Sequence, residues 1–377
     1  MPLPPGVFRA DHVGSLLRPA AIKSARLSVA SQKLDAAGLR KVEDDEIAAI
    51  VAKQLENGLK SITDGEFRRA YFHLDFLQQL GGVEMQGMIK SSSIGPEGWS
   101  PPRLAVTGKL THEKDVQVDD YKYLQGEIDR HPEKNGVMAK VCVPSPTMVH
   151  FRGGRASIDV SAYPSLDAFF EDLAHVYQQE LDSLYKAGVR FVQLDDTNLA
   201  YLCDETMRAE AKGRGDDPDL LPLRYAELIN AAISKRPKDL VVGIHLCRGN
   251  YRSKHFASGS YEPVAQVLFQ NLDVDVYFLE YDDARSGDFS PLRFLPPGKI
   301  VVLGVMSSKK AELDDKETII KRLHEAAEFC PEGLEQLCLS HQCGFSSTQE
   351  GNDLSEEQQW AKVRLEVEIA KEVWGDA

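Results

Sequence analysis

The sequence predicts an α/β protein, a single (β/α)8 TIM barrel with a hairpin insertion. Short apolar runs alternate with amphipathic helical segments along most of the 377 residues. About eight such runs are centred near residues 10, 62, 140, 192, 243, 278, 303 and 338, and most precede a helical pattern. Eight β/α units in a chain of this length suit one barrel with insertions. A doubly wound open sheet would use the same units and is the alternative, and we expect one domain over residues 1–377.

The first half of the chain supplies three strands, an insertion and several helices. Gly65 and Glu66 end the second strand, and Asn57-Gly58 gives the preceding helix a C-terminal stop signal. Residues 81–112 are rich in Gly, Ser and Pro without a helical period, so we expect an excursion with a hairpin, a candidate lid. The expected strands are 8–15, 61–66 and 138–143, and the expected helices are 39–59, 67–80 and 121–130.

The second half alternates regularly between strands and helices. Gly188 ends a long amphipathic helix, and each following apolar run is short and rich in β-branched residues. The expected strands are 189–194, 241–247, 276–280, 300–305 and 336–340. The expected helices are 166–187, one that ends at 234, 261–271, 316–329 and 355–374.

Composition narrows the partners and the compartment. A net charge of −14 and a pI near 5.3 argue against nucleic acid and anionic membranes. Apolar stretches are strand-sized, far short of a bilayer span, and the start lacks the pattern of a secretory signal. Six cysteines show no disulfide spacing. We expect a cytoplasmic protein with small-molecule partners, no nucleic-acid or membrane partner, and leave a homo-oligomer open.

A metal site is predicted from residues at the ends of three strands. His245 and Cys247 stand two residues apart, so both point to one side of an extended segment. Glu280 and Cys343 follow two later strands, and the carboxyl ends of parallel strands meet at one face. Imidazole, thiolates and a carboxylate suit Zn²⁺. The alternative is that these are unrelated strand ends in which the cysteines only pack.

Further polar residues are expected at the same face. Ser15, Glu66 and Asp195 each follow a predicted strand. The simpler interpretations are that Glu66 caps a helix and that Asp195 solvates a loop. A basic group after the fifth strand suits either an anionic substrate tail or a solvated loop. Its members are Arg248, Arg252, Lys254 and His255.

With these residues in hand, the chain resembles the catalytic barrel of cobalamin-independent methionine synthase and the short single-barrel relatives of that enzyme. The likeness runs from Asp11-His12-Val13-Gly14-Ser15 to the C-terminus, without the family's other barrel. It implies a fold of the UROD and methionine-synthase type. It also implies that zinc is held by His245, Cys247, Glu280 and Cys343.

The resemblance assigns roles to the neighbouring residues as well. Ser15, Glu66 and Asp195 are implied to hold the amino and carboxyl groups of a homocysteine-like thiol. Phe151 falls where the family stacks an aromatic ring against the pterin of methyl-folate.

One departure concerns proton supply. Methionine synthase has a histidine after the seventh strand, thought to protonate the leaving folate nitrogen, and Met306 stands there in this chain. Methionine cannot donate a proton. We take His12 as the candidate substitute, so His12 and Asp195 are the candidate catalytic residues.

The expected function is a zinc-dependent S-methyltransferase that methylates a homocysteine-like thiol in methionine biosynthesis. A zinc-bound thiolate is the nucleophile, and the alkyl donor is methyl-folate or another compound. One alternative is a 2-hydroxyalkyl-coenzyme M lyase, an epoxide:thiol transferase like one of the short relatives. A second alternative is a non-catalytic zinc- or folate-binding barrel.

Overall fold

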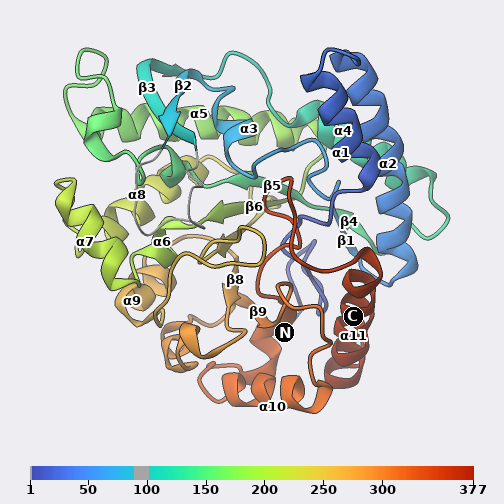
Figure 1. Ribbon diagram of the computed structural model, residues 1–377. Coiled ribbons are helices and arrows are strands. Elements are labelled where there is room, and N and C mark those ends of the chain that lie inside the picture. The colour runs from blue at the N-terminus through green and yellow to red at the C-terminus, as the bar shows by residue number, and fades with distance from the viewer. Residues whose placement is uncertain (1, 89–101) are drawn as a thin grey trace.

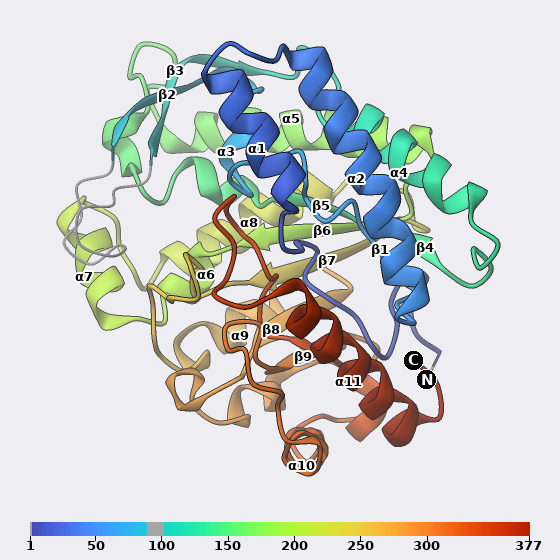
Figure 2. The ribbon, with the colours of Figure 1, turned by 45° about the vertical axis from the view of Figure 1, so that its right-hand side comes forward.

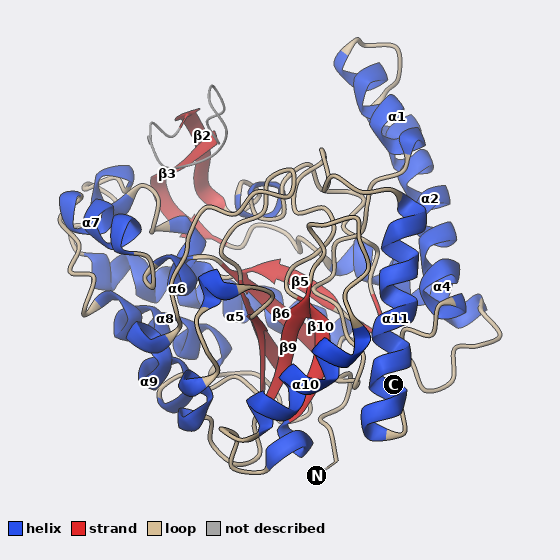
Figure 3. Cartoon of the chain, turned by 60° about the horizontal axis from the view of Figure 1, so that its bottom comes forward, coloured by secondary structure: helices blue, strands red, loops and turns tan. Residues whose placement is uncertain are grey.

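The computed structural model describes residues 2–88 and 102–377, and its centre is a parallel sheet surrounded by helices (Figures 1 and 3). Six strands pair in the order β10-β9-β8-β7-β6-β5, all parallel. The strands are β5 (Val141–Pro144), β6 (Phe191–Asp196), β7 (Val241–Leu246), β8 (Val276–Glu280), β9 (Ile300–Met306) and β10 (Leu337–His341). Every residue in them is buried, which accounts for their continuous apolar character.

Two further segments bring the barrel to eight parallel units. Strand β1 (Ser61–Ile62) pairs with β4 (Met138–Ala139), which leads directly into β5. At the other edge, Ala10 forms a parallel bridge with Leu339 of β10.

The remaining seam, between the first segment and β1, is spanned by other hydrogen bonds. His12 Nε2 lies 2.9 Å from the carbonyl oxygen of Ser61, and Thr63 Oγ1 donates to the carbonyl of Gly14 at 2.6 Å. Leu16 N donates to the carbonyl of Gly65 at 3.1 Å. The fold is the expected TIM barrel.

A ring of helices encloses the strands. Neighbouring helices contact one another in turn: α2 with α4, α4 with α5, α5 with α8, α8 with α9, and α10 with α11. The ring returns to its start where α11 lies beside the end of α2 (Figure 2). There Arg364 on α11 donates to the side chain of Asn57 at 2.9 Å. The helices are α1 (Ala20–Ala30), α2 (Ala36–Glu56), α3 (Leu74–Leu77), α4 (Val118–Arg130), α5 (Leu166–Ala187), α6 (Asn198–Tyr201), α7 (Glu205–Gly213), α8 (Leu221–Ile233), α9 (Glu262–Gln270), α10 (Lys316–Ala327) and α11 (Glu356–Trp374). Short 3-10 helices are η1 (Pro146–Val149), η2 (Gly154–Ser157), η3 (Ala284–Ser286), η4 (Ser290–Phe294) and η5 (Gly333–Gln336).

The segment after β1 corrects one expectation and confirms another. A continuous helix over residues 67–80 was wrong, because the chain forms turns and only the single-turn helix α3. The hairpin is present: β2 (Gly81–Met88) pairs antiparallel with β3 (Pro102–Thr111), and it projects beyond the barrel in Figure 3. The part of the 81–112 excursion that covers residues 89–101 lies outside the described residues.

Alternation along the strands positions the polar groups at one end of the barrel. A separate apolar cluster fills the other end; its members are Val7, Phe191, Val241, Val276, Phe278, Ile300, Val302 and Cys338, and we call it the barrel floor. Residues two apart share a face of a strand. Phe278 lies in the floor, so Glu280, two residues further along β8, points into the barrel above it. His245 follows Val241 on the same face of β7 and also points into the barrel.

Within residues 2–88 and 102–377, every helix is too short or too polar to cross a membrane.

Candidate metal centre

Four buried side chains from three strand ends converge on one point. They are His245 in β7, Cys247 just after it, Glu280 at the end of β8 and Cys343 after β10. One potential ligand atom from each lies within 4.8 Å of all the others, and the two sulfur atoms are 3.5 Å apart. The structure thus brings together all four residues expected to hold zinc.

The hydrogen-bond pattern leaves the potential ligand atoms open. His245 Nδ1 lies 3.2 Å from the carbonyl oxygen of Phe278, and because a carbonyl only accepts, Nδ1 carries the proton. His245 Nε2 and both carboxylate oxygens of Glu280 are buried and have no hydrogen-bond partner among the described residues. Buried polar atoms without partners are costly. This donor set of imidazole, two thiols and a carboxylate fits a tetrahedral Zn²⁺.

The two thiols differ in acidity. The hydrogen bond between Cys247 and Cys343, together with His245, lowers the pKa of Cys343 well below its usual value of 9. The same bond and burial raise the pKa of Cys247. The backbone N–H of Gly249 points at the Cys247 sulfur, at 3.2 Å. Gly249 has φ +91°, and a Cβ there would fall 2.1 Å from the ring of Phe256, so this turn requires glycine.

Arg248 fixes the elements that carry the ligands. Its guanidinium is fully buried and donates to the carbonyls of Gly259 at 2.8 Å and Glu280 at 2.9 Å. It also donates to the Tyr261 hydroxyl at 3.1 Å. The four basic residues expected here therefore differ in position. Arg248 is buried and holds the backbone, whereas Arg252, Lys254 and His255 are exposed.

A cavity of about 300 Å³, part of it open to solvent, adjoins the four residues, and we call it the thiol cavity. Ser15, Glu66 and Asp195, the residues expected to hold the substrate, all line it. The other lining residues are Val13, Phe72, His245, Cys247, Cys343 and Ser347. Side chains from the first, second, fourth, fifth and eighth strand ends therefore share one cavity.

Two acids dominate the charge of the thiol cavity. Burial raises the pKa of Glu66 to about 7. The positive charge of Arg69 lowers this pKa, and the negative charge of Asp195 raises it further. Burial also raises the pKa of Asp195 to about 6, opposed by His245 and by a 2.7 Å hydrogen bond from Gln193. Two acids this close favour a cationic substrate group between them.

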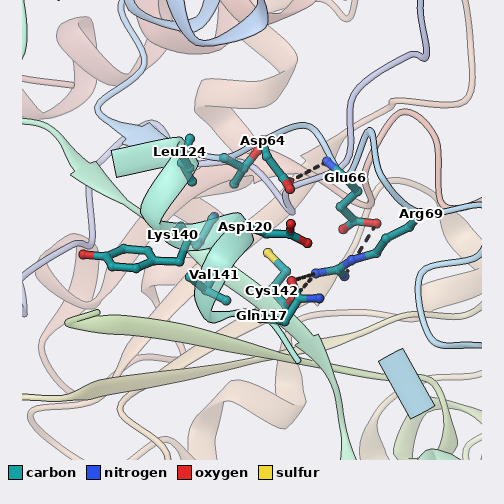
Figure 4. A pocket seen from close by; sticks show the side chains of 11 residues that line it. Asp64, Glu66, Arg69, Gln117, Asp120, Leu124, Lys140, Val141 and Cys142 are labelled. Carbon is teal, nitrogen blue, oxygen red and sulfur yellow. Dashed lines mark hydrogen bonds and ion pairs between the residues drawn. The ribbon is translucent and has the colours of Figure 1, made fainter. Parts of the chain in front are cut away.

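The backbone at Glu66 is set by its turn. Glu66 has φ +59°, and its N–H donates to the Asp64 carboxylate at 2.8 Å. Arg69 lies behind it, 4.0 Å from the Glu66 carboxylate, and bonds the side chain of Gln117 and the carbonyl of Cys142 (Figure 4). The carboxylate is held from behind, and its Oε2 has no hydrogen-bond partner among the described residues.

A second cavity, of about 420 Å³ including open solvent, lies next to the first, and we call it the donor cavity. It shares Phe72, Cys247 and Ser347 with the thiol cavity. Its wall holds five aromatic side chains: Tyr71, Phe72, Tyr201, Tyr251 and Phe256. No sequence pattern singled out these rings, although Tyr71 and Phe72 follow the Gly65-Glu66 strand end closely enough to be placed at this face.

Three residues singled out from the sequence lie deeper than expected. Phe151 is 3% exposed and packs against Tyr201, so Tyr201 is the ring at the cavity wall. His12 is bonded to Ser61, and burial with the nearby Lys140 lowers its pKa to about 3, which makes it neutral at pH 7. Met306 is fully buried at the end of β9.

Comparison with known proteins defines the class to which this fold and site belong. The catalytic-domain model of cobalamin-independent synthases matches residues 8–372, and the chain therefore belongs to that family. The uncharacterized protein YxjH of Bacillus subtilis (strain 168) is 43% identical over 368 residues, which cover 97% of this chain and 95% of that protein.

Two solved structures support the same fold. A crystal structure from Listeria monocytogenes, whose assignment as a vitamin-B12-independent methionine synthase is itself provisional, has a TM-score of 0.78 and 38% identity and covers 100% of both chains. A B12-independent methionine synthase from Shewanella sp. W3-18-1, in complex with selenomethionine, has a TM-score of 0.70 and covers 97% of this chain and 98% of its own. At 20% identity that second likeness shows the fold alone.

Proposed function

We propose that this protein is a zinc-dependent S-methyltransferase that methylates a homocysteine-like thiol, with residues 1–377 acting as one catalytic domain. The observation that carries the proposal is the set of buried ligand atoms on His245 and Glu280 that have no hydrogen-bond partner among the described residues, beside two thiols at the wall of a cavity with two acids. A closed structural zinc site would have no need of an adjoining acidic cavity. The family is one of synthases, which favours catalysis over simple zinc or folate binding.

The chain's own residues account for thiol binding and orientation. Bound zinc would supply stabilisation of the substrate thiolate at neutral pH. Glu66 and Asp195 accept hydrogen bonds from the substrate ammonium, and Ser15 Oγ offers a donor to its carboxylate. Val13 and Phe72 cover the cavity wall with apolar surface, which excludes water from the nucleophile. The selenomethionine bound by the Shewanella protein is an amino acid of the same shape as the proposed product.

Metal content tests the proposed ligands. Cys247→Ser and Cys343→Ser should each lose most of the bound zinc, because serine is a poor zinc ligand, while the helical circular-dichroism signal persists. Wild type should contain about one zinc per chain. Cys330→Ser is the matched control, since Cys330 is also buried but lies after α10, where its thiol bonds the carbonyl of Ala326 at 3.5 Å. Full zinc content in both ligand variants would exclude this site.

Thiol binding tests the substrate. The buried acids Glu66 and Asp195 should attract the ammonium of homocysteine and repel the sulfonate of coenzyme M. Titration calorimetry on the zinc-loaded protein should therefore give a lower Kd for homocysteine than for coenzyme M. In Glu66→Gln, the two Kd values should lie closer together. Tighter binding of coenzyme M would favour the epoxide:thiol transferase instead. Methionine formation from homocysteine and a methyl donor completes the test.

A further inference from the structure

The donor cavity is built differently from the thiol cavity. Three separate parts of the chain contribute its aromatic rings: Tyr71 and Phe72 before α3, Tyr201 in α6, and Tyr251 and Phe256 after β7. We call these five rings the aromatic cage. Phe72 and Cys247 line both cavities, so a molecule within the cage lies beside a thiol bound at the metal centre.

We propose that the aromatic cage binds the sulfonium or quaternary ammonium group of a zwitterionic methyl donor whose carboxylate pairs with Arg152. This inference rests on the proposed function, and it assigns the class of the second substrate.

The faces of several aromatic rings attract a cation. Rings that surround an onium group provide the usual means of recognising one in proteins. The half-buried Glu350 supports the same sign of charge, because it lies close enough to two of the rings, Tyr71 and Tyr251, to add to the effect of burial in raising the pKa of both hydroxyls. Glu350 Oε2 is buried without a hydrogen-bond partner in the part of the chain that the structure describes.

The donor cavity also holds a group that suits an anion. Arg152 lines it, and its guanidinium bonds the hydroxyl of Tyr201 while its Nε has no partner among residues 2–88 and 102–377. His73 also lines the cavity, is 5% exposed and has no hydrogen-bond partner for Nδ1 among the described residues. Burial and Arg152 lower its pKa, so it is a neutral imidazole. Arg152 would repel a simple cation, and the rings and this guanidinium together therefore fit a molecule with both charges.

The reaction with such a donor balances without an acid. The substrate thiolate attacks the methyl carbon, a new S–C bond forms, and the bond from that carbon to the positive sulfur or nitrogen breaks. The electron pair of the broken bond stays on the leaving atom, which departs as a neutral sulfide or tertiary amine. No proton is needed at the leaving atom, in agreement with Met306 at the end of β9 and with a neutral His12.

Binding to the metal-free protein tests the cage apart from catalysis. The probes are trimethylammonium butanoate, its neutral-headed tert-butyl isostere and butyltrimethylammonium, which share size but differ in charge. We expect the isostere and the carboxylate-free cation each to bind at least about ten-fold more weakly than the zwitterion. Equal affinity of the zwitterion and the isostere would overturn the proposal.

Substitutions of Tyr251 and Arg152 test which residues recognise the two charges of the zwitterion. Tyr251→Leu should abolish the preference for the zwitterion over the isostere, whereas Tyr251→Phe, which keeps the ring, should retain it. Arg152→Gln should remove the preference for the carboxylate, and Arg152→Lys should restore part of it. Unchanged preferences in Tyr251→Leu or Arg152→Gln would count against the cage, and Tyr251→Phe and Arg152→Lys keep the test valid if a larger change unfolds the protein.

Methyl transfer separates the two proposals. Zinc-loaded protein with homocysteine should form methionine from a dimethylsulfonium carboxylate and much more slowly from methyl-folate. If homocysteine binds at the metal and only methyl-folate reacts, the cage inference fails while the proposed function stands. If the zwitterion preference is found but homocysteine does not bind, the proposed function fails and the cage binding remains.

Discussion

Burial determines the protonation state of His150, the residue that follows η1. His150 is fully buried, and its Nδ1 lies 2.8 Å from the Tyr225 hydroxyl. Burial, with Arg214 and Arg224 nearby, lowers its pKa from 6.5 to about 4. The folded protein thus keeps this imidazole neutral at a pH where the unfolded chain takes up a proton.

His150 should therefore weaken the fold in mild acid. Its stabilising effect is complete above pH 6.5 and is lost as pH falls from 6.5 toward 4, by about 2 kcal/mol between pH 7 and pH 5. In His150→Gln, the free energy of unfolding should decline less over that range, as measured by denaturant titration. The exposed His175→Gln is the control and should follow wild type. Parallel pH profiles for all three proteins would contradict the argument.

At the scale of elements, the turn after β7 helps to fix the positions of the metal-ligand residues. Arg248 joins this turn to the end of β8 and to the start of α9 through four hydrogen bonds from one guanidinium. Lysine cannot reproduce that planar set of donors.

Arg248→Lys should consequently weaken zinc binding by about 10- to 100-fold without loss of the fold. Competition with a chromogenic chelator measures the affinity, and the exposed Arg252→Lys serves as the matched control. An unchanged affinity in Arg248→Lys would show that Glu280 and Cys247 keep their positions without this link.

At the scale of the whole molecule, the first segment closes the lower end of the barrel. Val7 is 4% exposed and belongs to the barrel floor, opposite the metal centre. Val7→Ala should lower the free energy of unfolding by about 2 kcal/mol and leave the zinc content of the folded protein unchanged. The exposed Val160→Ala should change neither. Loss of zinc in folded Val7→Ala would mean that the two ends of the barrel are coupled.

Much of this architecture follows from local sequence. The strands of a barrel are buried on both faces, so each gives a short apolar run, and the polar residues that end these runs share one face by topology alone. That argument places His245, Cys247, Glu280 and Cys343 together, and the resemblance supplies their roles.

The remaining features depend on tertiary contacts that no local pattern records. The helix expected over residues 67–80 yields to turns after Glu66, which has a positive φ, and to Asp75, which accepts the N–H groups of Ala70 and Tyr71. Phe151 lies behind Tyr201 because of packing between two distant segments. The aromatic cage is likewise assembled from three separate parts of the chain, and only Tyr71 and Phe72 follow a predicted strand end closely enough to be placed from the sequence.

The position of the ligands along the chain has a consequence for biosynthesis. A polypeptide emerges from the ribosome N-terminal end first, and His245, Cys247, Glu280 and Cys343 all belong to the later part of this chain. The first segment, which bridges to Leu339 of β10, must wait for nearly the whole chain before it finds its neighbour. Metal uptake and barrel closure should therefore occur together, late in translation or after release, and a nascent chain that ends before Cys343 should be unable to retain zinc.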